Sequence, residues 1–136
     1  MQEPQVIWII DDDLVSLYAT RYRIGQTKTT AKVFDFDTAE IALEYYEKAL
    51  RNKGQLPDII FLDLIMPGIN GWQFLETLKS MKAHGKVPNV YVLSSFSNSK
   101  DRRLAKEHAS ILGYFDKPIS KLDMERTLLS FENDAL

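Results

Sequence analysis

The sequence predicts an α/β fold in which helices cover both faces of a doubly wound, five-stranded parallel sheet. Short runs that are apolar at every position, typical of strands buried on both faces, alternate along the chain with segments of helical spacing. Such alternation is typical of parallel strands joined by right-handed crossovers. The chain has 136 residues, of which 45% are hydrophobic and 26% charged, so we expect a single domain over residues 1–136 with one continuous core.

Five segments are expected to form the strands. Three of them are apolar throughout and run into a polar group, namely residues 6–10, 59–62 and 90–93. Two weaker candidates are residues 31–36, which alternate in part between apolar and polar side chains, and residues 113–115. Trp8, Phe34 and Phe61 lie within these segments and are expected to pack in the core.

Five further segments have the spacing of apolar residues that is typical of helices. The first covers residues 14 to about 25, with Asp13 as its N-terminal cap. Asp37 and Glu40 form a capping-box pattern at the start of the second helix, which ends before Gly54. The remaining helices are expected at residues 72–81, 101–108 and 120 to about 133.

The composition excludes several classes of protein. Lys and Arg number 17 against 19 Asp and Glu, so we expect no strongly basic surface and no direct contact with nucleic acid. The absence of cysteine excludes disulfides and thiolate metal sites. The N-terminus does not resemble a signal peptide and no run of about 18 apolar residues occurs, so we expect no membrane contact and a cytoplasmic location. A dinucleotide-binding protein is disfavoured because no G-x-G-x-x-G run is present.

Charged or hydroxyl-bearing residues follow four of the predicted strands. In open parallel sheets, ligands bind at the carboxyl ends of the strands, which makes this edge the expected functional site. The residues concerned are Asp11, Asp12 and Asp13 after the first strand, Asp63 after the third, Ser94 and Ser95 after the fourth, and Asp116, Lys117 and Pro118 after the fifth.

The carboxylates at this edge would repel one another without a cation between them. Oxygen ligands without His or Cys favour Mg²⁺, and the charge of roughly −3 on Asp11, Asp12 and Asp63 would be balanced by Mg²⁺ and Lys117 together. A metal ion and a lysine suit phosphoryl transfer to a carboxylate, and Asp63 is the expected nucleophile because it stands alone after an apolar strand. A phosphatase is disfavoured because such enzymes usually carry a second acid two residues after the nucleophile, where this chain has Ile65.

Two of these assignments have competitors. The acidic pair could be Asp12 and Asp13, but the first strand leads directly into Asp11, which favours Asp11 and Asp12 and leaves Asp13 as a helix cap. Ser94 and Ser95 compete for one hydroxyl role, and Ser94 is preferred because it is the first residue after the apolar run.

Four motifs occur in order along the chain: Asp11-Asp12-Asp13, Asp63-Leu64-Ile65-Met66-Pro67-Gly68-Ile69-Asn70-Gly71, Ser94-Ser95, and Gly113-Tyr114-Phe115-Asp116-Lys117-Pro118. With these motifs the sequence resembles the receiver domain of two-component response regulators, and the likeness covers essentially the whole chain. The resemblance implies the strand order 2-1-3-4-5, a flavodoxin-like arrangement, and a cis peptide bond between Lys117 and Pro118.

The resemblance also implies a role for each site residue. Asp63 would accept a phosphoryl group, Asp12, Asp63 and the backbone carbonyl of Ile65 would bind Mg²⁺ directly, and Asp11 would bind it through water. Lys117 would contact the same site. 

Two further residues would respond to phosphorylation. The Ser94 hydroxyl would follow the phosphoryl group, and Tyr114 would be the aromatic residue whose rotamer changes with it. A half-buried core aromatic residue is an equally good interpretation of Tyr114.

The function implied by the resemblance is that of a stand-alone receiver without an output domain. A histidine kinase or a histidine phosphotransfer protein would donate the phosphoryl group, and the chain would catalyse only its own phosphorylation and dephosphorylation. A downstream protein would bind the face formed by the fourth helix, fifth strand and fifth helix. The alternative is a receiver-like interaction domain that works without phosphate.

Overall fold

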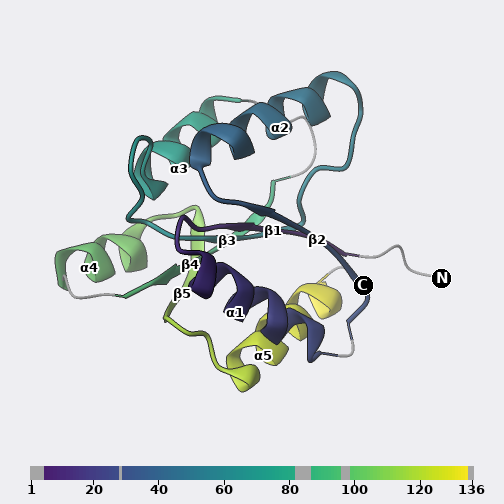
Figure 1. Ribbon diagram of the computed structural model, residues 1–136, viewed down its shortest axis with the longest axis vertical. Coiled ribbons are helices and arrows are strands. Elements are labelled where there is room, and N and C mark those ends of the chain that lie inside the picture. The colour runs from purple at the N-terminus through teal and green to yellow at the C-terminus, as the bar shows by residue number, and fades with distance from the viewer. Residues whose placement is uncertain (1–4, 28, 82–86, 96–98, 135–136) are drawn as a thin grey trace.

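The computed structural model describes residues 5–27, 29–81, 87–95 and 99–134. Five parallel strands form one sheet in the order β2-β1-β3-β4-β5 (Figure 1), which confirms the predicted fold class and strand order. The strands are β1 (Gln5–Ile10), β2 (Ala31–Phe36), β3 (Ile59–Leu62), β4 (Asn89–Ser94) and β5 (Ile111–Asp116). The helices are α1 (Leu14–Gly25), α2 (Ala39–Arg51), α3 (Gly71–Ser80), α4 (Ser99–Glu107) and α5 (Lys121–Asp134).

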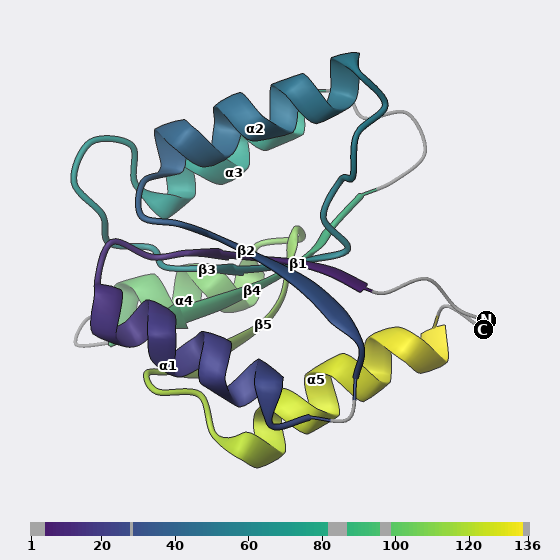
Figure 2. The same cartoon turned by 45° about the vertical axis from the view of Figure 1, so that its right-hand side comes forward.

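Helices cover both faces of the sheet, as Figures 1 and 2 show for α2 and α3 on one side and α1 and α5 on the other. One core cluster joins the sheet to Ala42 of α2, Phe74 of α3 and Ala105 of α4. A second cluster on the opposite face joins the sheet to Leu17 of α1 and Met124 of α5. Since helices lie on both sides, every residue of β1 and β3 is buried, which explains why β3 and residues 6–10 of β1 are apolar without alternation.

The strand β2 lies at the edge of the sheet and differs from the central strands. It pairs with β1 only, and its residues alternate between exposed and partly buried positions over most of its length. Trp8 and Phe61 are buried in the core as predicted, but the core prediction for Phe34 is wrong, because this side chain is 37% exposed on the edge strand.

The helix starts are set by local hydrogen bonds to short polar side chains. Asp13 caps α1 as predicted, and its carboxylate accepts the Val15 N–H at 3.0 Å. The predicted capping box of Asp37 with Glu40 is wrong. Thr38 is the cap of α2, because its backbone is extended and its hydroxyl oxygen accepts the Ile41 N–H at 3.2 Å.

The remaining boundaries differ from the predictions by a few residues. The strand β5 begins at Ile111, earlier than expected, and α3 begins with a capping box of Asn70 and Gln73, which was not predicted. The α2 segment ends at Arg51, three residues before Gly54. Within the described parts of the chain, no helix is both long and apolar enough to cross a membrane.

Candidate functional site

The candidate site forms where β1 and β3 end side by side. Ile10 lies opposite Leu62 in the parallel pairing of these strands, so the next residues, Asp11 and Asp63, leave the sheet at the same edge. The Asp63 N–H donates to the Ile10 carbonyl at 2.9 Å, and the Asp11 N–H donates to the Phe36 carbonyl at 3.0 Å. The backbone of both aspartates is therefore held by the sheet.

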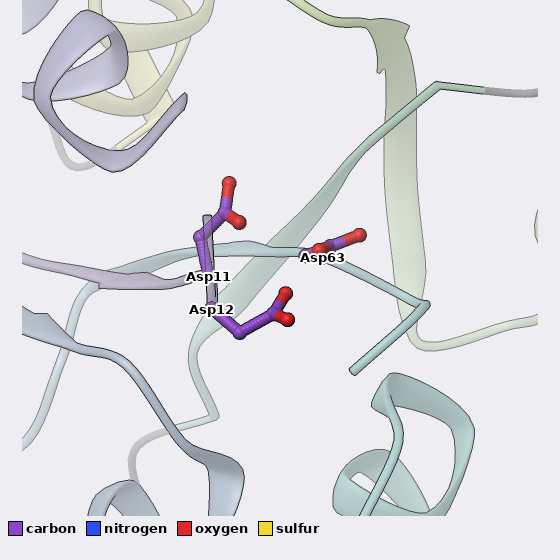
Figure 3. Close-up of side chains that lie close together, drawn as sticks. All are labelled: Asp11, Asp12 and Asp63. Carbon is purple, nitrogen blue, oxygen red and sulfur yellow. The ribbon is translucent and has the colours of Figure 1, made fainter. Parts of the chain in front are cut away.

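Three carboxylates gather at this edge. One oxygen from each of Asp11, Asp12 and Asp63 lies within 4.8 Å of the others, and Figure 3 shows the three side chains together. Asp11 and Asp63 are only 2% and 5% exposed, whereas Asp12 is exposed. Asp13 takes no part in this cluster because its side chain caps α1, while its N–H donates to Asp11 Oδ1 at 2.9 Å. The structure thus groups Asp63 with the first two aspartates of the triplet.

Lys117 reaches the buried carboxylates from the end of β5. Its Nζ lies 2.9 Å from Asp11 Oδ2 and 3.2 Å from Asp63 Oδ2, and its side chain is 14% exposed. The Lys117 N–H donates to the Ser94 carbonyl at 3.1 Å, and the Lys117–Pro118 bond is cis, as the resemblance implied. One ammonium group therefore bridges two buried carboxylates that come from two other strands.

The protonation of these groups is coupled through their short distances. Burial raises the pKa of Asp63, the Lys117 charge opposes this shift and the Asp11 carboxylate adds to it, so that the pKa of Asp63 stands at about 6. Burial lowers the pKa of Lys117, but its contacts with Asp11 and Asp63 outweigh this effect and hold that pKa above its ordinary value. Lys117 therefore stays charged at neutral pH, and Asp63 is an unusually basic carboxylate.

Ser94 and Tyr114 differ in how far they are buried. Ser94 is the last residue of β4 and is 2% exposed, whereas Ser95 is exposed. Tyr114 on β5 is half-buried and packs against the core cluster beneath α2, α3 and α4, with Lys106 Nζ 5.7 Å from the centre of its ring. Ser94 thus ends at the same edge of the sheet as the carboxylates, and Tyr114 lies partly in the core.

The loop between β3 and α3 borders the carboxylates. Leu64 and Met66 are buried, whereas the Ile65 side chain between them is 60% exposed. The Ile65 N–H donates to Asp63 Oδ1 at 3.2 Å. This hydrogen bond holds the backbone of Ile65 next to Asp63, while the Ile65 side chain faces the solvent.

Two polar contacts near this edge were not predicted from the sequence. Glu40 Oε1 accepts the Ile69 N–H at 2.9 Å, across 29 positions in the sequence. Arg102 Nη2 lies 2.9 Å from Asp116 Oδ1, which joins α4 to the end of β5. Each contact depends on how the chain folds back on itself, and no local pattern around Glu40 or Arg102 indicates its partner.

The donor set of the cluster fits a hard divalent cation. All three acidic side chains offer carboxylate oxygens, with a formal charge of roughly −3 against one lysine. Mg²⁺ prefers oxygen ligands and a small number of carboxylates, in contrast to ions that prefer nitrogen or sulfur. The residues present at this edge are therefore suited to hold Mg²⁺.

Several proteins whose names describe regulation or sensory transduction are similar to this chain. The chain is 32% identical over 126 residues to the sensory transduction protein LytT of Bacillus anthracis, and the match covers 93% of this chain and 46% of that protein. It is 24% identical over 127 residues to the probable methanogenesis regulatory protein FilR2 of Methanothrix harundinacea, covering 93% of this chain and 81% of that protein. The match to the nitrate/nitrite response regulator NarL of Escherichia coli is 28% identical and covers 93% of this chain, which spans 54% of NarL.

Solved structures share the fold. The two component response regulator from Cytophaga hutchinsonii superposes with a TM-score of 0.81 at 24% identity, covering 98% of this chain and 97% of that chain. The phosphorylated cyanobacterial phytochrome response regulator RcpA superposes with a TM-score of 0.74 at 20% identity, covering 96% of this chain and 92% of that chain.

A family model for the response regulator receiver domain matches residues 7–128. This range begins within β1, ends within α5, and contains every residue of the acidic edge described above. The chain therefore belongs to the response regulator receiver domain family, the signalling domain of two-component systems.

Proposed function

We propose that this receiver domain accepts a phosphoryl group on Asp63 in a reaction that requires Mg²⁺, with a histidine kinase or a histidine phosphotransfer protein as the donor. The observation that carries the proposal is the buried bridge of Lys117 between Asp11 and Asp63, with Asp12 beside it on the exposed side. Receiver domains generally bind Mg²⁺ at an acidic pocket, and this cluster has the oxygen ligands for it.

The transfer step needs an attacking oxygen and a leaving nitrogen on opposite sides of phosphorus. In the proposed reaction, a carboxylate oxygen of Asp63 forms a bond to the phosphorus of the donor's phosphohistidine. The P–N bond breaks, and its electron pair stays on the imidazole nitrogen of the donor. The Lys117 ammonium lies 3.2 Å from Asp63, where it can also offset the negative charge of the incoming phosphoryl oxygens.

Four groups of this chain would hold the metal ion: Asp12, Asp63 and the Ile65 carbonyl directly, and Asp11 through water. When bound, Mg²⁺ would neutralise charge on the phosphoryl oxygens during transfer. The exposure of Asp12 and Ile65 supports this assignment, because a hydrated ion and a protein donor both have to approach from the solvent.

Phosphorylation would then change a face of the domain that binds other proteins. A phosphoryl group on Asp63 adds negative charge and acceptor oxygens, to which the Ser94 hydroxyl can donate a hydrogen bond. Tyr114 would follow by changing its rotamer, and the face formed by α4, β5 and α5 would transmit the change to a downstream protein. The stand-alone organisation and the cytoplasmic location stay predictions from the sequence.

Intact-mass spectrometry after incubation with acetyl phosphate tests the proposed chemistry. The wild type should gain the mass of one phosphoryl group in Mg²⁺ and none in EDTA. Asp63→Asn should gain none under either condition, because the nucleophilic carboxylate is absent. Asp58→Asn is a matched control, because Asp58 precedes β3 whereas Asp63 follows it. The Asp58 carboxylate accepts the Val6 N–H at the other edge of the sheet, so this variant should be labelled like the wild type.

A wild type that gains no mass from acetyl phosphate, and none from a phosphorylated histidine phosphotransfer protein, would overturn the proposal. That result would favour the receiver-like interaction domain that works without phosphate. Labelling of Asp63→Asn at the wild-type rate would instead show that another residue accepts the phosphoryl group.

A further inference from the structure

The loop between Asp63 and Gly71 is closed at its base. The Gly71 N–H donates to the Leu64 carbonyl at 3.0 Å. A Cβ atom on Gly71 would lie 2.7 Å from both the Asp63 carbonyl oxygen and the Leu64 Cα, so a side chain at this position would force the two ends of the loop apart. The base of the loop is thus fixed by close backbone contact, and the burial of Met66 anchors its first half.

The second half of the loop has a different anchor. Pro67 and Gly68 are exposed, and Gly68 has a φ of +75°, a left-handed conformation that glycine adopts without strain. The neighbouring Ile69 N–H donates to Glu40 Oε1 at 2.9 Å. Both carboxylate oxygens of Glu40 also lie 3.2 to 3.3 Å from the point where a Cβ of Gly68 would be, so a side chain at this position would crowd the carboxylate.

Glu40 is not the N-terminal cap of its own helix. Thr38 is the N-terminal cap of α2, and its hydroxyl oxygen accepts the Ile41 N–H. The Glu40 carboxylate instead crosses from the first turn of α2 to the β3–α3 loop, where it accepts a charge-assisted hydrogen bond. Within the described parts of the chain, this is the side-chain hydrogen bond that ties the tip of the loop to another element.

We propose that Glu40 is a positioning residue for the metal site. By accepting the Ile69 N–H, it restrains the second half of the loop, in addition to the anchors at its base and at Met66, and so limits the movement of the segment that carries the Ile65 carbonyl. The inference rests on the proposed function, because it takes the Ile65 carbonyl as a metal ligand. Residues that orient a ligand without touching the metal commonly contribute to metal affinity.

The test measures Mg²⁺ affinity by calorimetry and the Ile69 amide by ¹H–¹⁵N NMR, in the whole chain without any phosphodonor. Glu40→Ala should bind Mg²⁺ about tenfold more weakly than the wild type. This is the lower end of the loss in metal affinity that is typical when a residue that orients a ligand is removed, because the Glu40 hydrogen bond is exposed. Its Ile69 amide proton should move upfield and exchange faster with solvent. Glu40→Gln keeps an acceptor oxygen, so its Mg²⁺ affinity should stay within about twofold of the wild type.

Glu44→Ala is the matched control, because Glu44 is an exposed carboxylate one turn further along α2. Because salt screens the charge of Glu44, its removal should change Mg²⁺ affinity by less than about twofold. If Glu40→Ala binds Mg²⁺ with the affinity of the wild type, the inference is wrong. It is also wrong if Glu40→Ala and Glu40→Gln lose the same amount of Mg²⁺ affinity, because the charge of Glu40 and not its hydrogen bond would then account for the loss.

Asp12→Asn separates this inference from the proposed function. If Asp12→Asn loses Mg²⁺ binding while Glu40→Ala keeps it, the metal site stands and only the role of Glu40 is wrong. If the wild type binds no Mg²⁺, or Asp12→Asn binds it like the wild type, the proposed metal site itself is wrong, and the role of Glu40 is wrong with it.

Discussion

The site has a buried flank and an exposed flank, and they differ in how charge is balanced. On the buried flank, the Lys117 ammonium lies 2.9 Å from Asp11 and 3.2 Å from Asp63. On the exposed flank, Asp12 and the Ile65 side chain face solvent, and no ion pair within the described ranges includes Asp12. Among the residues that the structure describes, one ammonium group, that of Lys117, is paired with this cluster of three carboxylates. Lys117 offsets one of the two buried negative charges, so the remaining charge of the cluster, including that of Asp12, has to be balanced by a cation from solution.

Loss of the buried cation should have the largest effect on stability. Lys117→Ala leaves Asp11 and Asp63 buried without their partner, and the free energy of unfolding in EDTA at pH 7.5 should fall by about 3 kcal/mol. Urea denaturation measures the change. Lys121→Ala removes an exposed lysine at the start of α5 and should change the same quantity by less than about 0.5 kcal/mol. If the two substitutions lower the free energy of unfolding equally, the buried ion pairs of Lys117 contribute no more to stability than an exposed lysine does.

The raised pKa of Asp63 predicts that ionising this carboxyl group lowers the free energy of unfolding. Its pKa is about 6 in the folded protein, against about 3.9 in an unfolded chain. Between these values the folded state binds more protons than the unfolded state, so the contribution of Asp63 to stability is lost as pH rises through this window.

Asp63→Asn removes this cost because its amide does not ionise. In EDTA, the unfolding free energy of the variant minus that of the wild type should increase by about 2 kcal/mol between pH 4 and pH 8. Urea titrations of both proteins across this range measure it. A difference that is constant with pH would show that Asp63 titrates alike in the folded and unfolded states.

The metal ion and the proton should compete for Asp63. Because Mg²⁺ requires the ionised carboxylate, the dissociation constant of Mg²⁺ should fall about tenfold between pH 5 and pH 7, through the pKa of about 6. Calorimetric titrations at several pH values measure this slope. A dissociation constant that does not change over the interval would argue against Asp63 as a metal ligand.

The exposed flank should show the smallest effect on stability. Asp12→Asn removes a charge that faces solvent, and the unfolding free energy in EDTA should change by less than about 0.5 kcal/mol. The same variant should lose most of its stabilisation by Mg²⁺, which thermal unfolding with and without Mg²⁺ measures. A large loss of stability in EDTA would mean that Asp12 supports the fold directly.

Much of the fold could be predicted because its signals are local. The apolar runs locate β1, β3 and β4, because strands that are buried on both faces consist mostly of apolar residues. The polar residues that end these runs place Asp11, Asp63 and Ser94 at one edge, because parallel strands present their carboxyl ends together.

The errors have physical causes that local patterns do not reveal. Phe34 has the apolar side chain of a core residue, but its exposure depends on β2 being the edge strand, which is a property of the whole sheet. Glu40 fits a capping box in the sequence, yet its carboxylate contacts a loop 29 residues away that only the fold brings near. The basicity of Asp63 likewise follows from burial and from the positions of Lys117 and Asp11 in space.

The position of the phosphoryl group is the most direct test of the central claim. After incubation with acetyl phosphate and Mg²⁺, treatment with borohydride reduces an acyl phosphate on aspartate to homoserine, which tandem mass spectrometry locates in the peptide sequence. We expect homoserine at position 63 and at no other aspartate. Homoserine at Asp11 or Asp12, or none at all in a protein that has gained the mass of a phosphoryl group, would contradict the account.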